Sequence, residues 1–197
     1  ESETEAGSGR LLLGVRRDGK NMEVKLTLKV MGTYSSTAPY DCPKTEKIIA
    51  YLEEWLAARG GGATRGGGFL GSDALFLLGS GNPKYQGLVR RVIYSKMAST
   101  DPTKPFESTR AGKSWYNSAD AVLFGEYFHA TGDRNVLPYL KNACDRLAAT
   151  QQPIGGWRHN FPGGATYGLI PNAGIPGVIG MNLAKAAGLD INMKAYE

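Results

Sequence analysis

Residues 118–136 read SADAVLFGEYFHATGDRNV. This is a mostly apolar run that ends at a glycine and leads into an amphipathic segment. The same order occurs at residues 72–85, SDALFLLGSGNPKY, and more loosely at residues 175–190, IPGVIGMNLAKAAGLD. The glycines that break the pattern are Gly81, Gly132 and Gly188. A repeat of about fifty residues with two helices in each unit is typical of helical arrays and rings.

The two helices of each unit differ in how their apolar residues are distributed. The first is apolar nearly all round, which predicts a buried inner helix, whereas the second has one apolar face and is predicted to be outer. An inner and an outer layer indicate a partial α/α toroid of helical hairpins. The helices are expected over residues 69–78, 85–97, 115–130, 135–150 and 174–187. These are fewer pairs than a closed ring needs, so we expect the remainder to come from missing sequence or from another chain.

A β-hairpin is predicted before the helices, with strands over residues 10–15 and 23–30. Asp18-Gly19 between them is a strong hairpin signal because both residues tolerate positive φ. Alternating apolar residues in the second strand predict that one face of the hairpin is buried. A lone hairpin is marginally stable in water, and the chain begins with Glu1 rather than Met. Both observations predict that the chain is a fragment.

The expected organisation is an incomplete β domain over residues 1–31, a linker over 32–43 and the helical region over 44–197. The first helix of that region carries one apolar stripe, which is predicted to be buried. Its members are Ile48, Ile49, Leu52, Trp55 and Leu56.

Composition excludes several classes of protein. The net charge is +5, but the basic residues form no stripe, so a nucleic-acid partner is not expected. No apolar run is long enough to span a membrane. Cys42 and Cys144 could pair if the fold brought them together, although two buried free thiols are the favoured alternative.

Residues 151–157, QQPIGGW, resemble the Gln-x-x-x-Gly-x-Trp core of the repeat found in terpene-cyclase-like α/α toroids. In physical terms the Gln amide can cap a helix end while the Trp ring closes over the turn. Leu147 stands where an aromatic residue is expected. The Asp-rich motifs of terpene cyclisation are absent from the sequence, so that activity is not implied.

Residues 9–20, GRLLLGVRRDGK, resemble the last two strands of a PDZ domain. Followed by residues 32–43, GTYSSTAPYDCP, and toroid helices, they are similar to an uncharacterised bacterial family with a PDZ-like domain before a toroid. This resemblance implies a periplasmic or extracellular location. The elements that build the PDZ peptide groove are not in the sequence, so binding of a peptide tail is not implied.

The best candidate site is an aromatic loop that includes Trp157, Arg158, His159 and Tyr167. Trp157 and Tyr167, together with Trp115, could stack on a sugar, and His159 could transfer protons near neutral pH. The favoured alternative makes Trp157 a core residue, leaves Arg158 solvated and gives His159 a loop carbonyl as partner.

Asp120 lies in an apolar helix, where a carboxylate can be functional with a raised pKa. Asp73 takes what looks like the same place in the preceding repeat, and this recurrence favours a structural hydrogen bond instead. Residues 111–114, AGKS, resemble the end of a phosphate-binding loop, but Glu107 replaces a required glycine. The two histidines and two cysteines have no metal-ligand spacing, so neither a metal nor a cofactor is expected.

Two functions remain open. The first is an interaction or binding module without catalysis, with a protein or a glycan as partner. The alternative is a carbohydrate-active enzyme, a glycoside hydrolase or polysaccharide lyase, that uses the toroid cavity. Its catalytic candidates are Asp120, His159, Arg158 and Tyr167.

Overall fold

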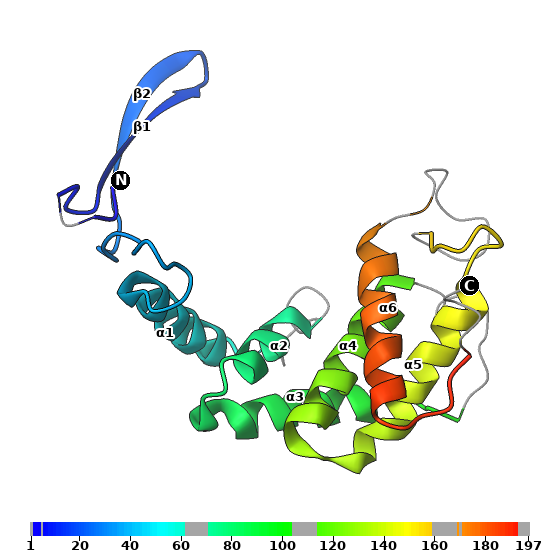
Figure 1. Cartoon of the computed structure of the whole chain (residues 1–197). Helices are drawn as coiled ribbons and strands as arrows, with labels where there is room; N and C mark the ends of the chain where they lie inside the picture. The colour runs from blue at the N-terminus through cyan, green and yellow to red at the C-terminus, as the bar shows by residue number, and fades with distance from the viewer. Residues whose placement is uncertain are drawn as a thin grey trace. The chain divides into compact units, whose positions relative to one another are not determined.

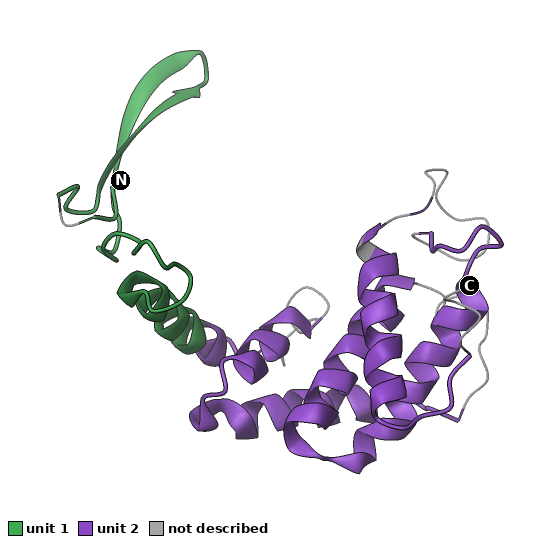
Figure 2. Cartoon of the chain, in the orientation of Figure 1, with its two compact units in different colours: residues 1–55 green, residues 56–197 purple. Residues whose placement is uncertain are grey.

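The computed structural model describes residues 2–4, 6–61, 71–103, 114–158, 169 and 171–192. These residues are mainly helical, with an antiparallel β-hairpin near the N-terminus (Figure 1). The chain divides into two compact units, residues 1–55 and 56–197 (Figure 2). Each unit is described by itself.

The hairpin of the first unit pairs β1 (Arg10–Arg17) with β2 (Lys20–Thr27). Arg17 lies opposite Lys20, so Asp18 and Gly19 alone make the turn. Their φ angles are 53° and 76°. Two positive φ angles belong to a two-residue turn whose twist matches that of the strands. The predicted hairpin and its turn are therefore confirmed.

The prediction that one face of the hairpin is buried is wrong. The strand register places Leu11, Leu13 and Val15 opposite apolar partners on a single face. On this face Leu13 is 40% exposed and Met22 is 50% exposed. Alternation fixes which side chains share a face, but burial needs a second layer. Among the described residues of the first unit, no element supplies that layer.

The segment predicted as a linker contacts the first turn of α1 (Pro43–Ala58), where the Lys44 ammonium lies 4.2 Å from the centre of the Tyr34 ring. The Ser35 amide donates to the sulfur of Cys42 at 3.4 Å, and Cys42 is buried. The buried Lys44 ammonium lies 3.3 Å from the Glu3 carboxylate. The amide of Met31 also donates to the carbonyl of Glu3 at 2.9 Å. These contacts join both ends of the hairpin to α1.

Helix α1 forms where the sequence predicts it, but most of its apolar stripe is not buried. Leu56 is 8% exposed, whereas Ile49 and Trp55 are 38% and 45% exposed. The packing within the first unit covers the beginning of the helix, which accounts for this difference from the prediction.

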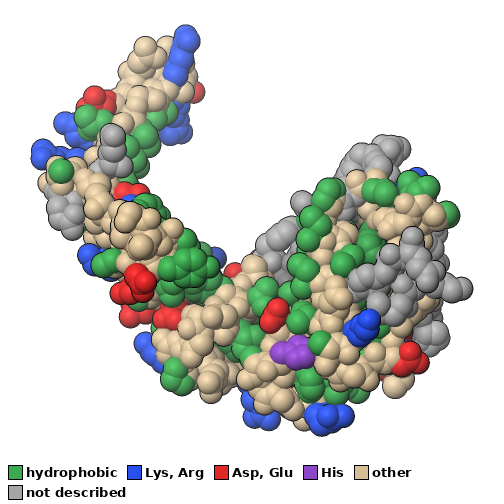
Figure 3. Space-filling view, viewed as in Figure 1, with side chains coloured by type: hydrophobic (Ala, Val, Ile, Leu, Met, Phe, Trp, Pro, Cys, Tyr) green, Lys and Arg blue, Asp and Glu red, His purple; other side chains and the backbone are tan. Residues whose placement is uncertain are grey.

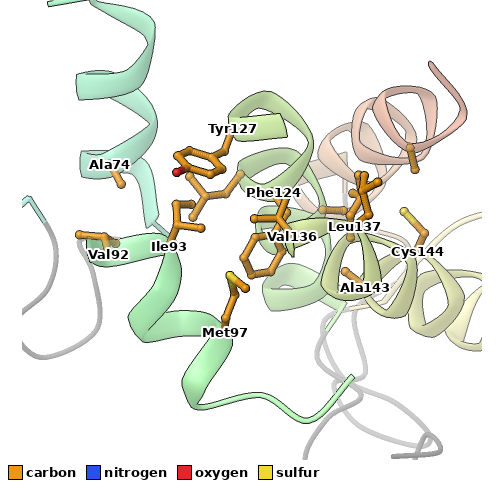
Figure 4. Packing of buried hydrophobic residues seen from close by; sticks show 14 of the residues in the cluster. Ala74, Val92, Ile93, Met97, Phe124, Tyr127, Val136, Leu137, Ala143 and Cys144 are labelled. Atoms are coloured by element: carbon orange, nitrogen blue, oxygen red, sulfur yellow. The ribbon is translucent and has the colours of Figure 1, made fainter. Parts of the chain in front are cut away.

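The second unit contains α2 (Ser72–Gly79), α3 (Gln86–Ala98), α4 (Ser114–Thr131), α5 (Leu137–Thr150) and α6 (Pro171–Ala186). Helix α4 packs on α2, α5 and α6, and α3 packs on α2. The predicted inner helices α2, α4 and α6 therefore contact one another in order. Figure 4 shows the apolar core, in which Ile93 and Met97 lie near Phe124 and Val136.

The turns after α2 and α4, in two of the three predicted repeats, have the same backbone pattern. After α2, Gly81 has a φ of 68° and the Asn82 side chain accepts from the amide two residues on, which begins a 3-10 turn, η2 (Pro83–Tyr85). After α4, Gly132 has a φ of 70° and Asp133 begins η3 (Arg134–Val136) in the same way. A positive φ suits glycine, and a short polar side chain satisfies an amide at a helix start.

Helices α4 and α6 approach closely because glycine or alanine occupies the contact. A Cβ atom added at Gly180 would lie 2.4 Å from the Cβ of Ala121, and one at Gly125 would lie 2.7 Å from the Cβ of Leu183. Pro176 interrupts the hydrogen-bond ladder of α6. In the same stretch the Ser118 hydroxyl donates to the Ala173 carbonyl at 2.6 Å.

The Gly180→Ala substitution should lower the free energy of unfolding by about 1–3 kcal/mol, because the added methyl group overlaps Ala121. Gly87→Ala is the matched control, since its Cβ would meet nothing within 4 Å in α3. That control should be neutral or stabilising by up to about 1 kcal/mol. Urea unfolding followed by circular dichroism measures both. Equal effects of the two substitutions would show that the α4–α6 contact is not tight.

Candidate functional site

An open cavity of about 500 Å³ lies between the N-terminal parts of α2, α4 and α6. Its volume is in the range of pockets that bind ligands. Trp115, which the sequence analysis named as a ligand-binding candidate, is part of its wall. The described lining residues are Gly71, Ser72, Leu75, Trp115, Ala119, Val122, Leu123, Pro171, Ile175, Pro176 and Ile179.

The described wall of this cavity is almost wholly apolar. Apart from the indole of Trp115, the only polar side chain in the described lining is the hydroxyl of Ser72. The described lining contains no carboxylate, imidazole or cationic side chain. These residues can therefore exclude water and bind apolar groups, but they carry no group that titrates near neutral pH.

A second cavity of about 450 Å³ adjoins the first along α6. Pro171, Ile175 and Ile179 line both cavities. Ile175 is 62% exposed and Ile179 is 45% exposed. The two isoleucines thus form an apolar ridge on α6 between two hollows. Figure 3 shows hydrophobic side chains at the surface around the N-terminal half of α6.

Trp157 is among the residues that line the second cavity but is only 2% exposed. Its Nε1 donates to the carbonyl of Leu147, 2.8 Å away, in the last turn of α5. The ring therefore packs as a core residue in this structure and presents no free face for stacking. It also satisfies one of the carbonyls that a helix end leaves without an intrahelical donor.

The glutamines before Trp157 close the turn. The Gln151 amide donates to the Gly155 carbonyl at 2.9 Å, and the Gln152 backbone amide donates to the Gly156 carbonyl at 2.8 Å. The side chain of Gln152 reaches back to the carbonyl of Thr150, the last residue of α5, at 3.3 Å. The side chains of Gln152 and Trp157 therefore cap the end of α5, and the side chain of Gln151 bonds within the loop.

The remaining residues of the predicted aromatic loop are placed only in part. Arg158 is exposed. His159 and Tyr167 lie outside the described residues, so the proposed roles of their side chains stay predictions.

Asp120 is not among the described lining residues of either cavity. Its carboxylate accepts from the Lys96 ammonium of α3 at 2.5 Å. Burial raises the pKa of Asp120, although Lys96 and then Arg146 act in the opposite direction. When the repeats are aligned on Gly81 and Gly132, Phe124 rather than Asp120 is the counterpart of Asp73. In that alignment Asp73 and Asp120 are not counterparts.

Asp133 is a structural carboxylate that the sequence analysis did not single out. It accepts from the Tyr94 hydroxyl at 2.9 Å and from the Asn135 backbone amide at 3.1 Å. Burial acts to raise the pKa of Asp133, but the hydrogen bonds from Asn135 and Tyr94 outweigh it, so the pKa is lowered. Its position directly after a breaking glycine is the signal that could have identified it as a helix cap.

Both cysteines are buried free thiols, as the favoured alternative predicted. Burial raises the pKa of Cys144 to about 12. The described residues contain no cluster of three or more His, Cys, Asp or Glu side chains suited to a metal ion. No described helix has the length and apolar character needed to cross a bilayer.

Comparison with known proteins gives one family. Residues 45–197 match the family described as "Domain of unknown function (DUF6288)". This match begins in the first turn of α1 and includes the whole of the second unit. The comparisons with curated proteins and with solved structures give no match.

Asp120 and Asp133 should affect stability with opposite dependence on pH. The raised pKa of Asp120 means that the folded chain holds this proton more tightly than the unfolded chain. Its contribution to the free energy of unfolding therefore falls as pH rises from about 4 through the raised pKa. The lowered pKa of Asp133 gives a contribution that is present above about pH 4 and lost as pH falls through the lowered value.

Urea unfolding of the wild type, Asp120→Asn and Asp133→Asn at a series of pH values tests this prediction. The stability difference, wild type minus variant, should decrease with rising pH for Asp120 and increase for Asp133. Two differences with the same slope would contradict the assigned environments.

Proposed function

The chain belongs to the DUF6288 family, and from that premise we propose that its helical region is a binding module for a partner polypeptide. In this proposal, apolar side chains of the partner enter the cavity between α2, α4 and α6. The observation that carries it is the 500 Å³ cavity with an apolar wall, which continues onto exposed isoleucines of α6.

The chemistry of the wall favours a protein over a glycan. Sugars are recognised through many hydrogen bonds as well as by stacking, and the described lining offers chiefly the Ser72 hydroxyl and the Trp115 indole. Exposed, contiguous apolar surfaces are typical of protein contacts. Ile175 and Ile179 extend such a surface beyond the cavity mouth, because they are exposed on the ridge between two hollows.

The proposal includes the partial α/α toroid as its architecture. It is supported by the contacts of α4 with both α2 and α6, and by the packing of α3 on α2 and of α5 on α4. In a toroid the inner helices face the centre. The cavity would then be part of the central concave surface, with Trp115, Val122 and Ile179 contributed by inner helices.

The alternative, a carbohydrate-active enzyme, has less support. Glycoside hydrolysis generally uses two carboxyl groups on opposite sides of the scissile bond. Among the described residues, no carboxylate lines the cavity, and Asp120 is engaged by Lys96. Competition between peptides and oligosaccharides for the cavity distinguishes the two functions.

The full chain should bind the apolar fluorescent dye 8-anilinonaphthalene-1-sulfonate at the cavity. Ile179→Glu places a charge in the wall and should weaken dye binding about tenfold, equivalent to about 1.4 kcal/mol. Ile154→Glu is the matched control, because Ile154 is 77% exposed and is not among the residues lining either cavity. Circular dichroism establishes that both variants fold.

Displacement of the dye identifies the class of ligand. A leucine- and phenylalanine-rich amphipathic peptide should displace it, whereas soluble oligosaccharides should not. Equal dye binding by Ile179→Glu and the wild type would rule out the cavity as the site. Displacement by an oligosaccharide alone would reject the polypeptide partner and support the carbohydrate function.

A further inference from the structure

The β-hairpin of the first unit has strand edges that no other described strand pairs with. Within the described residues the sheet contains only β1 and β2, so each strand has one edge without a neighbouring strand. Exposed edges with unpaired amide and carbonyl groups are a template for another strand. Long apolar edges of this kind are normally covered or blocked.

The register shows which main-chain groups face the free edge of β1. The Leu28 amide donates to the Gly9 carbonyl at 2.7 Å, and a two-residue turn makes Arg17 and Lys20 a hydrogen-bonded pair. Hydrogen-bonded and non-hydrogen-bonded pairs alternate along antiparallel strands. The amide and carbonyl groups of Leu12, Gly14 and Arg16 therefore point away from β2.

The side chains of β1 define what an added strand must present. Leu11, Leu13 and Val15 lie on one face, and the apolar face they share with β2 is uncovered. Every charged side chain of β1 is an arginine, whereas β2 carries Glu23 as well as its lysines. Figure 3 shows basic and hydrophobic side chains together at the surface of the hairpin.

We propose that the free edge of β1 binds an extended segment of a partner polypeptide in which apolar residues alternate with acidic ones. The apolar residues would extend the face of Leu11, Leu13 and Val15, and the acidic residues would lie near the arginines on the strand. Opposite-charge and apolar pairs across strands stabilise a sheet, as in other cases of strand addition.

The net charge of the hairpin favours an acidic segment at the β1 edge over the hairpin of a second copy of the chain. Residues 10–27 carry five basic and two acidic side chains, so two hairpins in contact would repel each other. The β1 edge is favoured over the β2 edge because Glu23 would lie beside an acidic strand added to β2. This inference does not depend on the cavity of the helical region.

Hydrogen exchange of the full, isotope-labelled chain, measured by NMR, tests the proposal. The probe is a synthetic peptide of about eight residues, the length of a typical strand, in which valine alternates with glutamate. At saturation, exchange should slow at least about tenfold at the amides of Leu12, Gly14 and Arg16. The amides of Asn21 and Lys25, on the opposite edge, should not change.

Two proline variants serve as a matched pair. Gly14→Pro removes an outward amide from β1, and a side chain at Gly14 would meet nothing within 4 Å. Glu23→Pro changes Glu23, the cross-strand partner of Gly14. The amide of Glu23 faces the free edge of β2. Peptide binding should be lost in Gly14→Pro and kept in Glu23→Pro. Protected amides at Leu13 and Val15, which face β2, report that the hairpin remains folded.

Control peptides test the stated chemistry. A peptide with lysine in place of glutamate, and a scrambled peptide of the same composition, should not slow exchange. Added salt should weaken the binding of the glutamate peptide, because salt screens its attraction to the arginines of β1. Protection of the β2 edge instead, equal binding by the lysine peptide, or protection that rises with chain concentration alone would each overturn the proposal. Protection by anionic lipid vesicles but not by the peptide would do so as well.

Discussion

The close contact between α4 and α6 is the constraint on which the helical unit depends. Gly180 and Gly125 leave no room for a Cβ atom, so the two backbones approach to a distance that larger residues would prevent. That approach brings the Ser118 hydroxyl to the Ala173 carbonyl, while on the α5 side the Cys144 sulfur lies 3.8 Å from the Gly180 carbonyl. It also fixes α6 so that Ile175 and Ile179 form the ridge between the two cavities.

Features that follow from local rules could be predicted from the sequence. Asp18-Gly19 specifies a two-residue turn, and the structure has the hairpin there because both residues adopt positive φ. Gly81 and Gly132 end helices in the same conformation, and the polar residue after each caps the next turn. The repeat was visible because the same backbone requirement selects the same residue types twice.

Burial could not be predicted in the same way. Periodicity shows which side chains share a face, but whether a second layer covers that face depends on contacts far along the chain. Trp55, and Leu26 of the second strand, were therefore expected to be buried and are exposed. Two tryptophans also have different structural roles. Trp157 belongs to a recognisable motif and supports the turn after α5, whereas Trp115 belongs to none and lines the cavity.

The described polar side chains of the helical unit make contacts between its elements. Asp120 is held by Lys96, Asp133 is held by Tyr94, and the His129 imidazole lies 3.0 Å from the Leu183 carbonyl. These contacts join α3 to α4, α3 to the turn before η3, and α4 to α6. The cavity wall is left with apolar surface, whose favourable interaction is with another apolar surface. The β1 edge differs because it is basic and, within the described residues, has no neighbouring strand for its outward main-chain groups. The described chain therefore presents two surfaces of different chemistry, an apolar cavity wall and a basic strand edge.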